Sequence, residues 1–246
     1  MTKIAILSDI HGNLDALKAV LVDAQTQGVQ RLFVCGDIAG YYYDTAAVWQ
    51  TLKMWDAVMC RGNHEAILAD WVADVGRDDI TRRYGSSYRI AAETMSQEDM
   101  GSLLSLSHPV EIIDDDVRFL LTHGAPWDED VYLYPDMTEE HRERLSGYAD
   151  RYDVVLMGHT HYPFAFEQDN FLILNSGSVG QPRSGKEILN LPDKARAQWA
   201  LYDTSDQTYS LITSSYDPSR IFEQAEKYDP HLPYLKTVLK RQDEVT

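Results

Sequence analysis

Short apolar runs alternate with amphipathic stretches over the first 60 residues of the chain. Lys3–Ser8, Arg31–Cys35 and Ala57–Cys60 are continuous apolar or β-branched runs, which are typical of strands covered on both faces. Leu14–Gln27 and Asp44–Lys53 separate these runs and space their apolar residues as a helix does. Strands that alternate with helices of this length predict βαβ units and a largely parallel sheet.

The second half of the chain favours antiparallel strands. Ile80–Leu106 has a more polar helical pattern, and Thr138–Tyr148 predicts a helix with Thr138 as its N-cap. Asp114–Asp116 and Asp169–Asn170 are turn-forming segments between short apolar runs, so each predicts a hairpin. The strands predicted in this half are Val110–Ile113, Val117–Thr122, Val154–Met157, Phe164–Glu167, Phe171–Asn175, Gln198–Tyr202 and Tyr209–Thr213.

No repeat, low-complexity tract or linker divides the 246 residues, so we expect a single domain over residues 1–246, of mixed α/β (α+β) class. The last segment, from about Pro218 to Thr246, predicts a helix and a tail. No apolar run approaches the roughly 18 residues that span a bilayer, and no signal-length apolar stretch opens the chain. The two cysteines, Cys35 and Cys60, exclude a disulfide framework. These features predict a cytoplasmic protein.

The chain is strongly acidic, with 22 Lys+Arg against 39 Asp+Glu and a formal net charge of −17. Such a charge argues against a broad contact with nucleic-acid phosphates or with an anionic membrane surface. The absence of a basic stripe also weakens the hypothesis of a DNA nuclease. We therefore expect a small molecule as partner, with no membrane and no nucleic-acid polymer.

Side chains that carry chemistry follow the predicted strands directly. The strand ends run into Ser8–Asn13, Gly36–Asp37, Gly62–Glu65, Thr122–Gly124 and Gly158–His161. In open α/β sheets, ligands bind in the crevice beyond the carboxyl ends of the strands. Five such ends bring two carboxylates, one amide and five of the eight histidines to one edge. These histidines are His11, His64, His123, His159 and His161, whereas His108, His141 and His231 lie elsewhere.

This mixture of ligand types favours first-row divalent ions such as Mn, Fe or Zn. Mg and Ca sites would not use so many imidazoles, and a thiolate site would need clustered cysteines. Eight candidate groups are too many for one ion but divide naturally between two. Two ions that share a carboxylate sit roughly 3.5–4 Å apart and clamp the attacking and leaving oxygens of an in-line displacement. They also lower the pKa of bound water, which predicts a bridging hydroxide as nucleophile.

Each motif alone also has a structural interpretation. Asp9 or Asn13 can cap the helix that follows the first strand, and a lone His123 is more often structural than a ligand. His159 and His161, two residues apart, are more suggestive, because in an extended loop they can address two different ions. The convergence of all five strand ends favours the metal hypothesis.

Asp-x-His-x-Asn, Gly-Asp, Gly-Asn-His-Glu, Thr-His and Gly-His-Thr-His occur in this order over about residues 3–180. In these motifs the chain resembles the calcineurin-like metallophosphoesterase superfamily. Asn175–Arg183 and Gly36–Tyr41 are similar to the small prokaryotic YfcE-like phosphodiesterase branch. The resemblance implies a two-sheet β-sandwich flanked by helices, the four-layer fold of these enzymes.

The resemblance also implies a role for each residue that matches a motif. His64 matches the histidine that is not a ligand, and it would steady the developing phosphoryl charge or protonate the leaving oxygen. A hydrogen-bonding role alone is the structural alternative for His64. One metal would be held by Asp9, His11, Asp37 and His161, and the second by Asp37, Asn63, His123 and His159, with Asp37 as the bridge.

One departure from the family pattern narrows the class. Protein phosphatases and symmetric diadenosine tetraphosphatases of the superfamily carry a Gly-Asp-x-x-Asp/Ala-Arg-Gly segment, and Gly36–Tyr42 lacks its arginine and its second aspartate. Protein dephosphorylation is therefore disfavoured, and so is a general-acid role for His64, which lacks the usual orienting carboxylate. Arg61, Arg183 and Tyr41 are candidate substrate contacts.

The Tyr41–Tyr43 run has two interpretations, because these rings can stack on a base or pack under the loop.

The leading hypothesis for the chain is a dinuclear metal-dependent phosphoesterase that hydrolyses small phosphodiesters or nucleotides. The alternatives within enzymes are a dinucleoside polyphosphate hydrolase and a phosphomonoesterase. The alternative outside enzymes is a metal-bound, non-catalytic regulatory or nucleotide-sensing protein.

Overall fold

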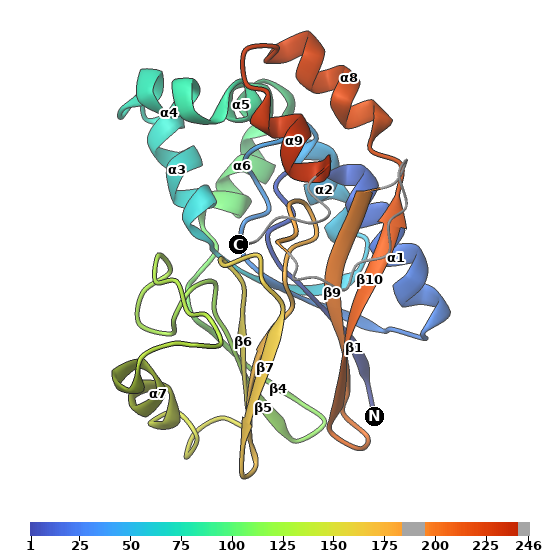
Figure 1. Cartoon of the computed structure of the whole chain (residues 1–246), viewed down its shortest axis with the longest axis vertical. Helices are drawn as coiled ribbons and strands as arrows, with labels where there is room; N and C mark the ends of the chain where they lie inside the picture. The colour runs from blue at the N-terminus through green and yellow to red at the C-terminus, as the bar shows by residue number, and fades with distance from the viewer. Residues whose placement is uncertain (184–194, 241–246) are drawn as a thin grey trace.

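Two five-stranded sheets lie face to face (Figure 1). The structure, a computed structural model, describes residues 1–183 and 195–240. The first sheet has the strand order β10-β9-β1-β2-β3 and the second the order β4-β5-β6-β8-β7. The strands are β1 Lys3–Leu7, β2 Arg31–Cys35, β3 Asp56–Cys60, β4 Val110–Asp114, β5 Val117–Leu121, β6 Val154–Met157, β7 Phe164–Gln168, β8 Phe171–Asn175, β9 Ala195–Asp203 and β10 Thr208–Tyr216.

Each sheet combines parallel strands with antiparallel ones. In the first sheet β1, β2 and β3 are parallel, and the hairpin of β9 and β10 joins β1 in the antiparallel sense. In the second sheet β5, β6 and β8 are parallel, with β4 and β7 as antiparallel edges. The parallel strands are the ones whose ends carry the motifs, so the topology delivers those motifs together.

Alternation along the strands divides the core into layers. In β1, Ile4 and Ile6 face the second sheet, whereas Ala5 packs against the helices. In β5, Phe119 points between the sheets and Leu120 toward the outer layer. Because both faces of both sheets are covered, the central strands are apolar throughout, as their sequences predict.

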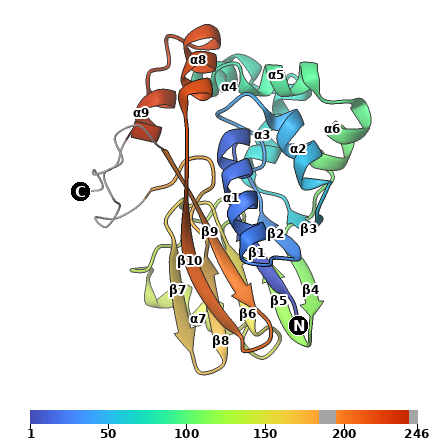
Figure 2. The ribbon, with the colours of Figure 1, turned by 90° about the vertical axis from the view of Figure 1, so that its right-hand side faces the viewer.

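The helices supply the two outer layers (Figure 2). Helices α1 and α2 cover the outer face of the first sheet, α3 to α6 and α8 to α9 gather at one end of the sandwich, and α7 covers the second sheet. This arrangement confirms the four-layer fold. The helices are α1 Leu14–Thr26, α2 Thr45–Leu52, α3 Asn63–Val72, α4 Arg77–Tyr84, α5 Ser87–Thr94, α6 Gln97–Leu104, α7 Glu139–Ser146, α8 Ser219–Tyr228 and α9 Tyr234–Lys240.

Most predicted elements are confirmed within a few residues, including the two predicted hairpins and the N-cap of α7, where Thr138 accepts from the His141 N–H. Helix α3 is not among the predicted elements, because it begins at Asn63, inside the motif that follows the third predicted strand. The strand predicted from Gln198 begins earlier, at Ala195. Within the described residues, no helix is both long and apolar enough to cross a membrane. The single domain stays a prediction.

Candidate metal centre

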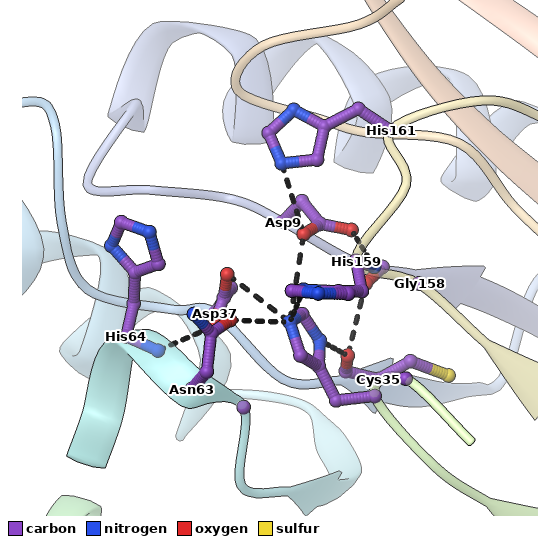
Figure 3. A network of polar contacts seen from close by, with 12 residues as sticks. Asp9, Cys35, Asp37, Asn63, His64, Gly158, His159 and His161 are labelled. Carbon is purple, nitrogen blue, oxygen red and sulfur yellow. Dashed lines mark hydrogen bonds and ion pairs between the residues drawn. The ribbon is translucent and has the colours of Figure 1, made fainter. Parts of the chain in front are cut away.

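The loops after five parallel strands meet at one end of the sandwich (Figure 3). The first sheet supplies Asp9 and His11 after β1, Asp37 after β2 and Asn63 after β3, and the second sheet supplies residues after β5 and β6. Every predicted metal ligand except Asn63 is buried, and Asn63 is half-buried. The seven ligands predicted from the sequence, Asp9, His11, Asp37, Asn63, His123, His159 and His161, therefore lie in one cluster.

The backbone of this cluster is unusually strained. Asp9, His11, Asp37, His159 and His161 all have φ between 52° and 66°, in the left-handed region. L-residues rarely adopt this conformation, which costs of order 1–3 kcal/mol each and persists where the surrounding structure enforces it. Such strain concentrates at functional sites, so the backbone supports a function for these residues independently of their side-chain chemistry.

Backbone carbonyls fix the imidazole rings. The Nδ1 atoms of His11, His123 and His161 lie 3.1, 2.7 and 2.7 Å from the carbonyls of Ala39, Cys35 and Gln181 respectively. His159 uses its other nitrogen, since its Nε2 lies 3.2 Å from the carbonyl of Asp130. A carbonyl accepts only, so each of these nitrogens carries its proton, and the opposite nitrogen faces the cluster. This is the usual environment of a metal-ligating histidine.

In the first half of the cluster, which consists of Asp9, His11 and His161, hydrogen-bond acceptors face one another with no donor between them. The Nε2 atoms of His11 and His161 lie 3.1 Å apart, and both rings have their Nδ1 on a carbonyl. Oδ1 of Asp9 has no hydrogen-bond partner, although it is buried and lies 3.2 Å from the His161 Nε2. Burial of unpaired acceptors is costly, and a cation would satisfy all of them. The residues present therefore fit a metal ion.

The second half of the cluster attracts positive charge as strongly. Burial opposes a charge on His123, but Asp37 and Asp9 outweigh it and raise the pKa of His123 to about 10. Burial lowers the pKa of the neighbouring His159 to about 4, and His123 acts in the same direction. Asn63 Oδ1 and His159 Nδ1 lie 3.0 and 3.2 Å from His123 Nε2. A divalent ion would take the place of the proton on His123.

Asp37 lies between the two halves. Its Oδ2 is 3.2 Å from His123 Nε2 and 3.7 Å from His11 Nε2, and its Oδ1 accepts from the His64 N–H at 2.8 Å. Asp9, His11 and His161 form one group of mutually close ligand atoms, and Asp37, His123 and His159 form another. Each of these groups is part of one of the two ligand sets that the family resemblance implies. A third group of close ligand atoms, His11, Asp37 and His64, joins the two halves through Asp37. The individual ligand assignments stay predictions.

His64 differs from the other clustered histidines. It is buried beside them, but its Nδ1 contacts the hydroxyl of Tyr88 at 2.7 Å and no backbone carbonyl. Burial lowers the pKa of His64 to about 4. Gly40, at φ +99°, lies against this ring, and a Cβ there would collide with His64 Nδ1. The ring is thus held from two sides, and Tyr88 was not found from the sequence.

Glu65 is a second residue that the sequence did not single out. Its buried carboxylate accepts the backbone N–H groups of Asp37, Ala39 and Gly62 at 2.9, 2.9 and 2.8 Å. It therefore ties the loop after β2, which carries Asp37, to the first turn of α3, which carries Asn63. We assign Glu65 a positioning role for the metal ligands.

Glu65→Gln is expected to lower stability by about 3 kcal/mol, because the amide keeps one acceptor oxygen and points its NH₂ at a buried N–H. For a chain of this size that loss corresponds to a fall in Tm of roughly 6–12 °C, measured by calorimetry. The matched control is Glu93→Gln on α5, where the exposed carboxylate pairs only with Arg89, and its cost is expected to stay below about 0.5 kcal/mol. Equal Tm values for both variants would contradict the positioning role.

A cavity of about 360 Å³ opens above the clustered ligands and is lined by Asp37, Asn63, His64, His159 and His161. Two of the predicted substrate contacts, Tyr41 and Arg183, also line this cavity. The third, Arg61, does not line it and instead forms an ion pair with Glu129 at 2.9 Å. All three roles stay predictions.

The tyrosine run after Gly40 divides between the cavity and the core. Tyr42 and Tyr43 are buried and pack under the loop, which answers the sequence-based choice for these two rings. The Tyr42 hydroxyl donates to the carbonyl of Leu235, and that of Tyr43 to Asp229. The C-terminal helices α8 and α9 therefore hold the loop that presents Tyr41, and only residues 241–246 of the predicted tail lie outside the described residues.

The family is shown by comparison with known proteins. The model of the calcineurin-like phosphoesterase superfamily domain matches residues 2–192. The chain belongs to this superfamily. The match confirms the resemblance predicted from the motifs and the expected enzyme class, a phosphoesterase.

Curated relatives support the same placement. The chain is 26% identical over 244 residues to the uncharacterized protein MJ0912 of Methanocaldococcus jannaschii, a match that covers 91% of this chain and 92% of that protein. It is 22% identical to the phosphodiesterase MJ0936 of the same organism, over 80% of this chain and 96% of that one. It is 25% identical to the phosphodiesterase YfcE of Escherichia coli, over 75% of this chain and 83% of that protein.

Solved structures show the same fold. The hypothetical protein PH1004 of Pyrococcus horikoshii superposes with a TM-score of 0.78 at 19% identity, covering 99% of this chain and 100% of that one. A metallophosphoesterase of Sphaerobacter thermophilus superposes with a TM-score of 0.73 at 22% identity, covering 96% and 99%. The two-sheet sandwich flanked by helices is thus confirmed.

Proposed function

We propose that the protein is a dinuclear metal-dependent phosphodiesterase that hydrolyses small phosphodiesters. The observation that carries this proposal is that Asp37 Oδ2 lies within 3.7 Å of one histidine from each half of the cluster, His11 and His123. Two divalent ions of the Mn, Fe or Zn type, held there, would lower the pKa of a bound water and withdraw charge from the phosphoryl oxygens. Water oxygen bonds to phosphorus, the bond from phosphorus to the leaving oxygen breaks, and the proton of water passes to solvent or to the leaving group.

The chain's own residues orient and stabilise the reacting group. Asp9, His11 and His161 would hold one ion, His123, His159 and Asn63 the other, and Asp37 both. His64 reaches the same cavity with its Nε2, which has no hydrogen-bond partner among the described residues. Since the Tyr88 hydroxyl has no other acceptor among those residues, it donates to Nδ1, and Nε2 then carries the proton. His64 would therefore donate to an oxygen of the phosphoryl group.

Tyr88→Phe removes the donor that selects this tautomer of His64. We expect kcat to fall by about 10- to 100-fold, as for other outer partners of site residues, with KM and metal content little changed. The steady-state kinetics of bis-p-nitrophenyl phosphate hydrolysis give kcat and KM, and elemental analysis gives the metal content. Tyr84→Phe is the matched control, because its hydroxyl makes no hydrogen bond with another described residue although its ring lies 5.1 Å from His64. An equal loss of kcat in both variants would contradict a role for the Tyr88 hydroxyl.

Removal of the metal should abolish turnover. Protein treated with a chelator and dialysed is expected to hydrolyse bis-p-nitrophenyl phosphate at the uncatalysed rate and to recover activity when Mn is added. Titration with Mn followed by elemental analysis should give two ions per chain. Tight binding of Mn without turnover of any phosphoester would favour the non-catalytic alternative. A panel of mono-, di- and dinucleotide phosphoesters distinguishes a phosphodiesterase from a phosphomonoesterase and from a dinucleoside polyphosphate hydrolase.

The setting that we propose is the cytoplasm, with a small phosphoester as partner and no membrane or nucleic-acid polymer. Cys35 and Cys60 are free, buried and aligned opposite each other on β2 and β3. Free thiols in this arrangement are typical of a reducing compartment.

A further inference from the structure

Two exposed tyrosines form an aromatic shelf, and one of them, Tyr132, lines the cavity. The shelf consists of Tyr132, which is 51% exposed, and Tyr134, which is 36% exposed. Their rings are nearly parallel, at 12° and 6.3 Å between centroids, and the Tyr132 ring lies on that of His159 with centroids 3.9 Å apart. Leu133 between them is buried, so the shelf side chains point outward while their backbone is anchored in the core.

The loop that carries the shelf is fastened to the metal-ligating cluster. Glu129 binds Arg61, which follows β3, and the Asp130 carbonyl accepts from His159 Nε2. Gly124, at the start of the loop, lies so close to the Glu129 carbonyl that a Cβ would approach it to 2.6 Å. Two tyrosine rings held side by side next to a cavity offer a face on which a planar ring can stack.

The same cavity contains two guanidinium groups that form no ion pair with a described carboxylate, although Asp37, Asp70 and Asp130 also line it. Arg83 and Arg183 line it, and neither has an Asp or Glu partner within 4.0 Å among residues 1–183 and 195–240. Arg83 instead lies over the ring of Tyr84, and its backbone carbonyl accepts from Tyr234 of α9. In a chain of net charge −17, two unpaired guanidiniums at one cavity point to an anionic ligand group. The metal ions would compensate the scissile phosphate, so the guanidiniums are available to another anion.

We propose that this cavity selects nucleotides that carry a phosphate besides the scissile one. The base stacks on the aromatic shelf, and the additional phosphate binds Arg83 and Arg183. Planar rings of every base stack on tyrosine, and the contact is worth roughly a factor of ten in affinity per base. The inference rests on the proposed phosphodiesterase function and names its substrate class.

Three esters with one leaving group test the proposal. They are methyl p-nitrophenyl phosphate, the p-nitrophenyl ester of thymidine 5′-phosphate, and the same thymidine ester with a 3′-phosphate. All release p-nitrophenol, so differences in kcat/KM report the rest of the molecule. With Mn-loaded wild-type protein we expect kcat/KM to rise roughly tenfold from the first ester to the second and again from the second to the third.

The variants separate the two contacts. Tyr132→Leu should remove most of the gain in kcat/KM from the methyl to the thymidine ester, and elemental analysis of its Mn content shows whether the neighbouring His159 is disturbed. Tyr134→Leu leaves the ring on His159 in place and should reduce the same gain, so a loss cannot come from a disturbed ligand alone. Arg83→Gln and Arg183→Gln should reduce the gain in kcat/KM from the 3′-phosphate more than the gain from the base. The control is Tyr209→Leu on β10, outside this cavity, for which no change is expected.

Equal kcat/KM for the three esters would overturn the inference and leave the phosphodiesterase function standing. The same holds if the shelf variants lower the rates on all three esters by one factor. Absence of Mn-dependent hydrolysis of every ester would instead remove the proposed function itself, so the two failures are distinguishable.

Discussion

Asp37→Asn is expected to abolish activity, with a loss of roughly 10³-fold or more in kcat/KM, because metal-ion stabilisation of the transition state is worth several kcal/mol. The asparagine keeps an oxygen for the His64 N–H but removes the charge that faces both His123 and His11. We expect fewer than two Mn ions per chain after dialysis, measured by elemental analysis alongside the hydrolysis of bis-p-nitrophenyl phosphate.

The control is Asp70→Asn on α3. Asp70 lines the same cavity but belongs to none of the groups of ligand atoms. Its replacement changes the local charge by the same amount, and we expect activity and metal content within about threefold of wild type. Full activity of Asp37→Asn with two ions bound would refute the bridging position, whereas equal losses in both variants would indicate a general effect of charge.

The cluster of candidate metal ligands was predictable because its signals are local. Each ligand lies within a few residues of a strand end, and parallel strands bring their carboxyl ends to one edge whatever the loops between them do. His159 belongs to one group and His161 to the other, as the sequence suggested, but the reason is not an extended loop, because both residues have φ in the left-handed region.

The supporting residues were not predictable in this way. Tyr88 lies 24 positions from His64 and reaches it only because α5 packs against α3. The buried hydroxyl of Tyr42 donates to the carbonyl of Leu235 in α9, 193 positions away. Glu65 is part of a motif, but its three backbone partners depend on how two loops approach each other. Contacts of this kind are set by tertiary packing, and the pattern of a single element does not contain them.

Asn13 and Asp9 belong to the same motif after β1, but the first has a structural role and the second lies in the cluster. Asn13 caps α1, with its Oδ1 accepting from the Ala16 N–H, and its Nδ2 donates to the carbonyl of Gly180. Asp9 caps nothing and leaves one oxygen unpaired in the cluster. The structural interpretation of the sequence is thus confirmed for Asn13, and it is wrong for Asp9.

His64→Gln is expected to lower kcat by about 10²- to 10³-fold, the usual loss when one donor to a developing oxyanion is removed. Metal content should not change, because the family resemblance places His64 outside both ligand sets and its Nδ1 contacts the Tyr88 hydroxyl. His231→Gln, an exposed histidine outside the strand ends, is the control, and we expect wild-type kinetics from it. Loss of a metal ion from His64→Gln would refute its assignment as a non-ligand.

The His64→Gln variant also shows whether His64 donates to a phosphoryl oxygen or to the leaving oxygen. A neutral imidazole that donates from Nε2 is a good hydrogen-bond donor and a poor acid, so we expect His64 to stabilise the phosphoryl oxygens. The factor lost should then be the same for a p-nitrophenyl ester and for the corresponding phenyl ester, whose leaving group is more basic. A much larger loss on the phenyl ester would show that His64 protonates the leaving oxygen, which is the role that an orienting carboxylate, absent from Gly36–Tyr42, would have supported.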